Sequence, residues 1–128
     1  MTAAATTGPV VWIVDADHWP RAYLRAELIE RGYDAVGFVS LSDALARLHV
    51  SGGAPRPRLA VVDLAGQAAE LKLLPALARA GVPLVGIGAA AATAADAVQQ
   101  VPWAAYLRRP LTIGDIADAV DGLVEGRG

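Results

Sequence analysis

Four charged side chains follow short apolar runs of the chain and have the right chemistry to act together. Asp15 and Asp17 come after one such run, Asp63 after another and Arg109 after a third. Carboxylates packed close together repel one another unless a cation compensates them, and Mg²⁺ prefers oxygen ligands of this kind. Such a set suits transfer of a phosphoryl group to an aspartate, with metal and arginine neutralising the transferred oxygens.

The apolar runs that precede these residues are continuous, as in parallel strands buried on both faces of a sheet. Segments with the spacing of helices or turns separate them. This alternation predicts an α/β fold: a doubly wound parallel sheet with right-handed crossovers and helices on both faces. The expected strands span residues 10–14, 35–39, 59–62, 82–87 and 103–107.

In a doubly wound sheet, ligands bind beyond the carboxyl ends of the strands. This rule selects the four charged residues and adds the position that follows the fourth expected strand. The selected residues are Asp15, Asp17, Asp63, Gly88 and Arg109. The sequence therefore predicts one acidic pocket that faces one cationic side chain.

Helix signals of different strength lie between the expected strands. The first helix is expected to begin near Trp19 and to end before Gly32. An alanine-rich helix of weak amphipathicity is expected over residues 89–100. The apolar stripe of the first helix contains Tyr23, Leu24, Leu28 and Ile29.

Two residue pairs have the spacing of a capping box and indicate where helices begin. They are Ser40 with Asp43, and Thr112 with Asp115. Pro75 interrupts the third helical pattern, because proline removes a backbone donor and clashes inside a helix. Either that helix is kinked, or Pro75 lies in the first turn of a short helix.

Taken in order, these blocks resemble the receiver domain of response regulators. The stretches that carry the resemblance are VVWIVDADHWPRAYLRAELIERGYDAV, SDALARL, LAVVD, GVPLVGIGA and AAYLRRPLT. The resemblance implies a flavodoxin-like (βα)5 fold with strand order 2-1-3-4-5, and a signalling domain of a two-component phosphorelay rather than an enzyme. We expect the receiver-like domain to span residues 9–126, behind a disordered lead-in of residues 1–8.

The resemblance also implies roles for individual residues. Asp63 falls on the aspartate that accepts the phosphoryl group. Asp15 falls on the first of two acidic positions that bind Mg²⁺ together with that aspartate. Tyr106 falls on the aromatic switch position of the fifth strand.

Other positions of the family's pocket hold different residue types in this chain. Ala16 replaces the second acidic residue, which usually touches the metal, and Asp17 is its neighbour. Gly88 replaces a hydroxyl residue, and Arg109 replaces a lysine that precedes proline. Glycine cannot donate a hydroxyl hydrogen bond, and arginine is a planar fork instead of a point charge. These changes predict a weakened Mg²⁺ site and an atypical phosphate switch.

Two functions remain open on this evidence. In one, Asp63 receives a phosphoryl group from a histidine kinase or a phosphotransfer protein. In the other, the chain is a pseudo-receiver that binds proteins without phosphorylation, and Arg109 pairs with Asp63 in place of metal or phosphate. The expected partner face combines residues 89–100, 103–107 and the last helix, and a homodimer through this face is a further option.

Two residues of the pocket also have local alternatives. Asp17 precedes the first expected helix, so its side chain could cap that helix instead of binding a metal. Tyr106 could serve ordinary strand packing instead of a switch. The sequence leaves both alternatives open.

Composition excludes several other classes of protein. The 128 residues contain no cysteine, which rules out disulfides and thiolate metal sites. The 11 basic and 13 acidic residues form no basic stripe, so we expect no direct contact with nucleic acid. Because the chain has no long apolar run and no signal-peptide pattern, we expect a cytoplasmic protein with no membrane contact. No flavin, cobalamin or dinucleotide signature is present.

Overall fold

One parallel sheet forms the centre of the structure, a computed structural model that describes residues 8–50, 56–93 and 95–126. Its strands are hydrogen-bonded in the order β2-β1-β3-β4-β5, which confirms the predicted doubly wound fold. The expected disordered lead-in lies outside the described residues, apart from Gly8. The strands are β1 (Val10–Val14), β2 (Asp34–Phe38), β3 (Leu59–Asp63), β4 (Leu84–Ile87) and β5 (Ala105–Leu107).

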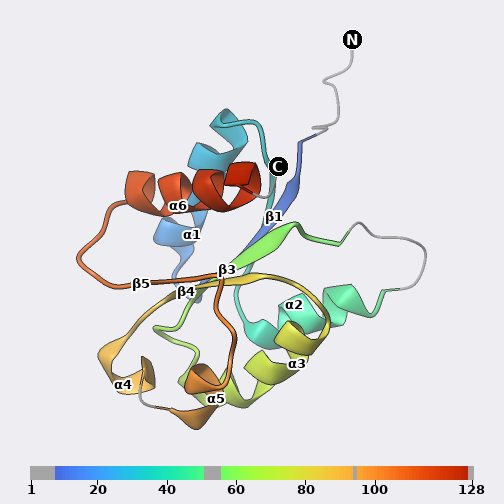
Figure 1. Cartoon of the computed structure of the whole chain (residues 1–128), viewed down its shortest axis with the longest axis vertical. Coiled ribbons are helices and arrows are strands. Elements are labelled where there is room, and N and C mark those ends of the chain that lie inside the picture. Colours follow the sequence, from blue (N-terminus) through green and yellow to red (C-terminus); the bar gives the residue numbers. More distant parts are fainter. Residues whose placement is uncertain (1–7, 51–55, 94, 127–128) are drawn as a thin grey trace.

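Helices cover both faces of this sheet (Figure 1). On one face, α1 (His18–Glu30) packs against α6 (Ile113–Gly126). None of the described helices is long and apolar enough to cross a membrane. The other face carries α2 (Leu41–Leu48), the 3-10 helix η1 (Ala68–Leu73), α3 (Leu74–Arg79), α4 (Ala90–Thr93) and α5 (Asp96–Gln99).

The sheet separates two apolar cores. Side chains alternate along β1, so that Val11 and Ile13 pack toward α1 and α6, whereas Trp12 and Val14 pack toward α2 and α3. All four side chains are at most 3% exposed. This burial on both faces explains why the run that forms β1 is apolar without interruption.

The predicted helix starts at the capping boxes are confirmed. The Ser40 hydroxyl accepts a hydrogen bond from the backbone N–H of Asp43 at 3.2 Å, where α2 begins. At the start of α6, the Thr112 hydroxyl accepts from the Asp115 N–H, and the Asp115 carboxylate accepts from the Thr112 N–H. These contacts satisfy backbone donors that have no partner within their helices.

The third helical segment takes the shorter of its two predicted forms. Pro75 lies in the first turn of α3, where its missing N–H costs no helical hydrogen bond. The preceding residues form η1 instead of extending α3. The helix ends before Gly81, whose φ of 87° lies in the left-handed region.

The predicted alanine-rich helix over residues 89–100 is wrong. This segment contains two helices of one turn, α4 and α5. Ala95 has an extended conformation (φ −68°, ψ 139°) just before α5, which ends any continuous helix. Alanines bury too little apolar surface to hold a long helix against the sheet.

The apolar stripe expected on the first helix is only half correct. Leu24 and Leu28 are buried, but Tyr23 is 59% exposed and Ile29 is 41% exposed. The buried pair lies at i and i+4, which is sufficient to face the sheet. Tyr23 instead stacks on Trp19, with the ring centroids 5.9 Å apart, on the outer surface of α1.

The fourth and fifth strands begin two residues later than predicted, at Leu84 and Ala105. Pro83 directly precedes β4 and has no backbone N–H to donate to a neighbouring strand, and Pro102 lies three residues before β5. Trp103 leaves the sheet, and its indole N–H donates to the Val98 carbonyl oxygen at 2.9 Å.

Candidate functional site

Asp15, Asp63 and Arg109 lie together where β1, β3 and β5 end. They line a hollow of about 310 Å³ that also contains Ala16 and Asp17. The strands reach this edge in parallel, so residues far apart in the sequence meet there. The structure thus brings together the charged residues that the sequence selected.

An ion pair between Arg109 and Asp63 spans this hollow. The Arg109 Nη2 atom lies 2.5 Å from Asp63 Oδ2, and Nη1 lies 3.5 Å from Oδ1. Asp63 Oδ1 also accepts a hydrogen bond from the Ala65 N–H at 3.0 Å. Asp63 is 4% exposed, so its charge is compensated almost entirely by protein groups. The Arg109–Pro110 peptide bond is cis.

Asp15 is the second buried carboxylate of the site, at 7% exposed. Its Oδ1 atom accepts a hydrogen bond from the Asp17 N–H at 2.9 Å. Burial raises the pKa of the Asp15 carboxyl, and the negative charges of Asp63 and Asp17 raise it further. The hydrogen bond from Asp17 and the charge of Arg109 oppose this rise. The surrounding groups therefore compensate the negative charge of the Asp15 carboxylate only in part.

Asp17 occupies the N-cap position of α1, but its side chain makes no capping hydrogen bond to the described residues. Asp17 therefore holds the N-cap position that the sequence left open for it, but no described residue donates a capping hydrogen bond to its side chain. Asp17 is exposed at the edge of the hollow. Beside it, Ala16 packs so closely on the loop after β3 that a Cβ atom at Gly66 would lie 2.8 Å from the Ala16 Cβ.

The donor set of the hollow does not fit a resident Mg²⁺ ion. Hard cations of this type require several oxygen ligands, and Ala16 supplies none where the resemblance implies an acid. Arg109 contacts both oxygens of Asp63. Within the described parts of the chain, no three histidine, aspartate or glutamate side chains are grouped to hold a metal. The positive charge beside Asp63 comes from the Arg109 guanidinium group.

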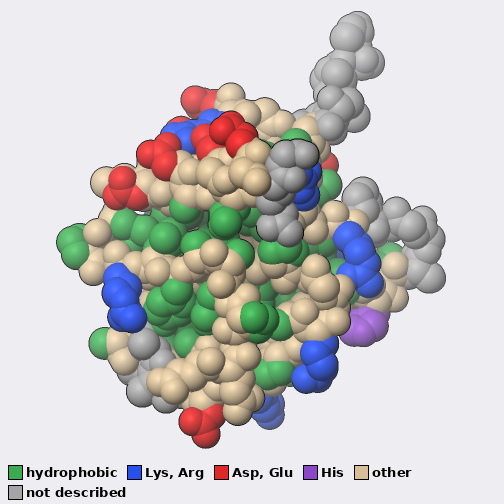
Figure 2. All heavy atoms as spheres, viewed as in Figure 1, with side chains coloured by type: hydrophobic (Ala, Val, Ile, Leu, Met, Phe, Trp, Pro, Cys, Tyr) green, Lys and Arg blue, Asp and Glu red, His purple; other side chains and the backbone are tan. Residues whose placement is uncertain are grey.

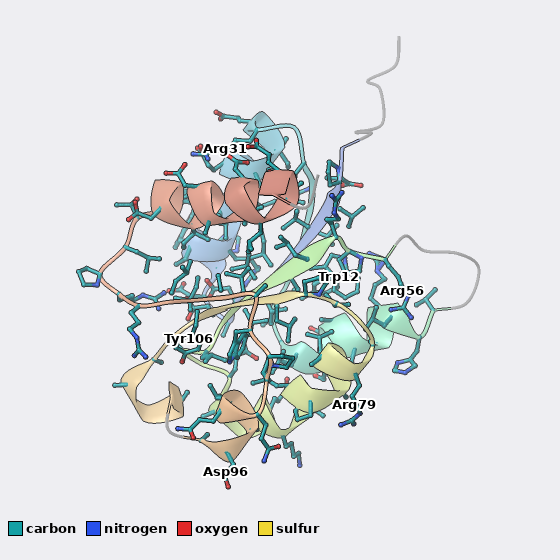
Figure 3. All side chains as sticks on the ribbon, in the orientation of Figure 1. Trp12, Arg31, Arg56, Arg79, Asp96 and Tyr106 are labelled. Atoms are coloured by element: carbon teal, nitrogen blue, oxygen red, sulfur yellow. The ribbon has the colours of Figure 1, made fainter. Side chains whose placement is uncertain are left out.

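Gly88 and Tyr106 share one volume at the end of β4. A Cβ atom built at Gly88 would lie 3.0 Å from both Cε2 and Oη of Tyr106. At Gly86, which is paired with Tyr106 in the sheet, a Cβ would lie 2.8 Å from the Tyr106 ring. The Tyr106 ring thus lies over Gly86 and Gly88, in space that their lack of side chains leaves open, on the α4 and α5 side of the sheet (Figure 3).

Neighbouring side chains hold this tyrosine ring on two further sides. The Trp103 ring centroid lies 5.4 Å from that of Tyr106. The Arg108 guanidinium carbon lies 5.5 Å from the centre of the Tyr106 ring, within the range of a cation–π contact. The aromatic residue of β5 therefore has a well-defined inward position.

Two residues that lie outside the lining of the site, but hold backbone near it, were not found from the sequence. Arg21 Nη1 donates to the Asp15 carbonyl oxygen at 2.7 Å and so fixes the end of β1. Gln67 is 2% exposed, and its side chain donates to the Val39 carbonyl oxygen at 3.1 Å. Neither residue belongs to a sequence motif. A buried glutamine in a loop indicates a structural hydrogen bond, but only once its burial is known.

Comparison with models of protein families found no match, and comparison with curated proteins found none either. Solved structures, in contrast, match over most of the chain. The receiver domain of the TMAO respiratory system response regulator TorR is 18% identical, with a TM-score of 0.74. The match covers 91% of this chain and 96% of that one.

Two further structures extend this likeness. A response regulator receiver protein from Burkholderia phymatum is 23% identical, with a TM-score of 0.73, over 91% of this chain and 95% of its own. NtrX from Brucella abortus, solved in complex with ATP, is 20% identical with a TM-score of 0.72. That match covers 94% of this chain but 28% of NtrX. The chain therefore has the fold of a response-regulator receiver domain.

Proposed function

We propose that the protein is a receiver-type signalling module that acts by binding other proteins and does not depend on phosphorylation. It is not an enzyme, and it works in the cytoplasm. Its partners are components of two-component systems, such as histidine kinases or phosphotransfer proteins. The Arg109–Asp63 ion pair holds its pocket in one state.

The ion pair of Arg109 with Asp63 carries this proposal: its Nη2–Oδ2 contact is short, at 2.5 Å, and the Nη1–Oδ1 contact is longer, at 3.5 Å. In a phosphorylatable pocket, an aspartate oxygen must be free to attack phosphorus, while cations neutralise the incoming oxygens. Here both oxygens of Asp63 face one guanidinium group, and Oδ1 also accepts from the Ala65 N–H. A planar guanidinium group binds a carboxylate at two points, and this favours a standing pair.

The packing of Tyr106 over Gly86 and Gly88 supports the same conclusion. To act as a switch, an aromatic ring needs a second position that a hydrogen bond stabilises in one state of the domain and not in the other. Gly88 has no hydroxyl group, and the Tyr106 ring lies where a side chain at position 88 would be. The ring therefore remains inward whether or not Asp63 is modified.

The proposed partner surface lies along the β5 edge, between α6 on one side and α4 and α5 on the other. Figure 2 shows hydrophobic side chains on both sides of this edge. A shallow hollow of about 220 Å³ lies there, lined by Trp103, Tyr106 and Arg108 together with Val98 and Gln99. Aromatic and arginine side chains are the residue types enriched at protein interfaces.

Titration with Mg²⁺ and beryllofluoride, followed by amide NMR, tests this proposal. We expect no saturable shift of the amides near Asp63 and β5 at millimolar concentrations. A saturable response that the Asp63→Asn variant lacks would contradict the proposal. A second measurement compares a two-component partner's affinity for the wild type and for Asp63→Ala, which we expect to agree within about twofold.

Phosphoryl transfer to Asp63 is the second candidate function, because the hollow of about 310 Å³ borders this carboxylate directly. An Asp63 oxygen would form a bond to phosphorus as the P–N bond of a phosphohistidine breaks, and the imidazole would take up a proton. Arg109 would have to leave Asp63 for the phosphoryl oxygens. Intact mass after incubation with acetyl phosphate distinguishes the two functions, since only the second adds one phosphoryl group at Asp63.

A further inference from the structure

A groove of about 570 Å³ runs along the outer side of α1, next to the free edge of β2. Its lining includes residues from the first to the last turn of α1, so it extends for about 18 Å at 1.5 Å per residue. Its floor contains the small residues Ala22, Ala26 and Gly37. Neither the acidic hollow nor the β5 surface contributes a residue to this groove.

Two arginines form the polar wall of the groove, and the protein backbone holds both in place. Arg21 Nη1 donates to the Asp15 carbonyl oxygen at 2.7 Å. Arg25 Nε donates to the Ala35 carbonyl oxygen, at the outer edge of β2, at 2.9 Å. Residues at i and i+4 are neighbours on a helix surface, so the two guanidinium groups lie on the same side of α1.

The stem of Arg21 is fixed by packing as well. A Cβ atom built at Gly37 would lie 3.1 Å from Arg21 Cγ, so the arginine lies directly over the glycine backbone. Side chains held in this way lose less rotamer freedom when they bind a ligand, and this favours affinity. Each guanidinium has five N–H donors, of which only a part is used by the backbone.

The charge of the groove is opposite to that of the whole chain. Arg21 and Arg25 outnumber the one acidic lining residue, Glu30, whereas the chain carries a net charge of −2. Ile29, at the far end of the groove, is 41% exposed. The groove therefore combines two fixed donors for anions with an apolar contact.

From these features we propose that the α1–β2 groove binds an acidic peptide segment of a partner protein. Two carboxylates of the segment pair with Arg21 and Arg25, and an apolar side chain lies against Ile29. The length of the groove favours a peptide over a small anion, which would contact one arginine and leave most of the groove empty. This interaction is independent of Asp63 and of the β5 surface.

Fluorescence anisotropy with two labelled peptides of equal length tests the proposal. One peptide alternates glutamate with leucine, and the other alternates glutamine with leucine. We expect the glutamate peptide to bind the wild type at least about tenfold more tightly, with an affinity that falls as salt increases. Equal affinity for the two peptides would overturn the proposal.

Variants locate the binding to this groove. Arg25→Gln removes one donor, and Ala26→Glu adds a negative charge without removing any contact; each should weaken binding by about tenfold. Arg79→Gln is the matched control, because Arg79 is an exposed arginine on α3, on the opposite face of the sheet (Figure 3). Its affinity should stay within about twofold of the wild type.

Two outcomes would overturn the assignment. An equal loss of binding in Arg79→Gln would mean that the peptide responds to overall charge. If inorganic phosphate displaced the peptide at an equal concentration, the groove would be a site for small anions and not for a peptide. Circular dichroism of each variant verifies the fold, and Ala26→Glu keeps the test decisive if Arg25→Gln is unstable.

Discussion

Arg109 lies against Asp63 with its Nη2 atom 2.5 Å from Oδ2 and its Nη1 atom 3.5 Å from Oδ1. The two partners differ in exposure, since the Arg109 side chain is 47% exposed and that of Asp63 only 6%. Loss of the arginine therefore leaves a buried charge, whereas loss of the aspartate leaves a solvated one. The two partners should respond differently to substitution.

Arg109→Gln should lower the free energy of unfolding by about 1–2 kcal/mol, because the buried Asp63 side chain would lose its partner. The double variant Asp63→Asn, Arg109→Gln should recover part of this loss, since no buried charge remains. Urea denaturation of the wild type, both single variants and the double variant measures this coupling. Strictly additive losses would show that the pair contributes nothing to stability.

Asp15→Asn should stabilise the protein at neutral pH. The raised pKa of Asp15 means that the folded chain holds this proton more tightly than the unfolded chain does. Ionisation of Asp15 therefore lowers the free energy of unfolding as pH rises from its ordinary pKa of 3.8 through the raised value. Asparagine avoids this loss and keeps an oxygen to accept from the Asp17 N–H.

Denaturation of Asp15→Asn and the wild type between pH 3 and pH 7 measures this effect, because this range brackets the ordinary aspartate pKa of 3.8. The gain should be largest at neutral pH and should disappear as the pH falls below that value. Asp43→Asn, an exposed substitution on α2, serves as the control. A gain for Asp15→Asn that did not change with pH would contradict this explanation.

Gly88→Ala should displace the Tyr106 ring and destabilise the fold by about 1–2 kcal/mol, because the new Cβ enters space that the ring fills. Near-UV circular dichroism and tryptophan fluorescence report the displacement, because the Trp103 ring contacts that of Tyr106. In a Tyr106→Ala background the same substitution should be nearly neutral. Gly122→Ala, where a Cβ would meet no described atom within 4 Å, should instead stabilise α6 by up to about 1 kcal/mol.

Tyr33→Phe should cost about 1 kcal/mol, because the buried Tyr33 hydroxyl donates to Asp121 Oδ1 at 2.5 Å. Burial and the nearby Asp121 raise the pKa of Tyr33 from 10.0 to about 12. The folded state therefore holds this proton more tightly, and its stability falls as pH rises between those values. Phenolate absorbance should show a late-titrating component from Tyr33, which Tyr33→Phe removes.

The sheet was predictable because its signal is redundant. The runs of β1 and β3 are apolar and almost fully buried, as strands covered on both faces require, and an acidic residue marks the end of each. The alanine-rich segment before β5 failed because alanine has high helix propensity in any context, whereas tertiary packing decides whether a helix continues. The extended Ala95 could not be inferred from propensity.

The members of the site were predictable, and the pairing of Arg109 with Asp63 was one of the two interpretations that the sequence left open; the structure shows this ion pair, but its geometry was not predictable. The strand-end rule selected Asp15, Asp63 and Arg109, since it depends only on the order of elements. The rule does not say that Arg109 contacts both oxygens of Asp63, because that depends on side-chain conformation. Arg21 was missed for a similar reason, since its partner is the backbone carbonyl of Asp15 and carries no sequence signature.

The shared volume of Gly88 and Tyr106 has a consequence for how such sequences diverge. A side chain at position 88 and an inward aromatic ring at position 106 compete for the same space, so neither position can change freely alone. Among homologues that keep this packing, a large residue at one position should accompany a small or outward-facing residue at the other. Gly86, opposite Tyr106 in the sheet, should vary together with the same pair.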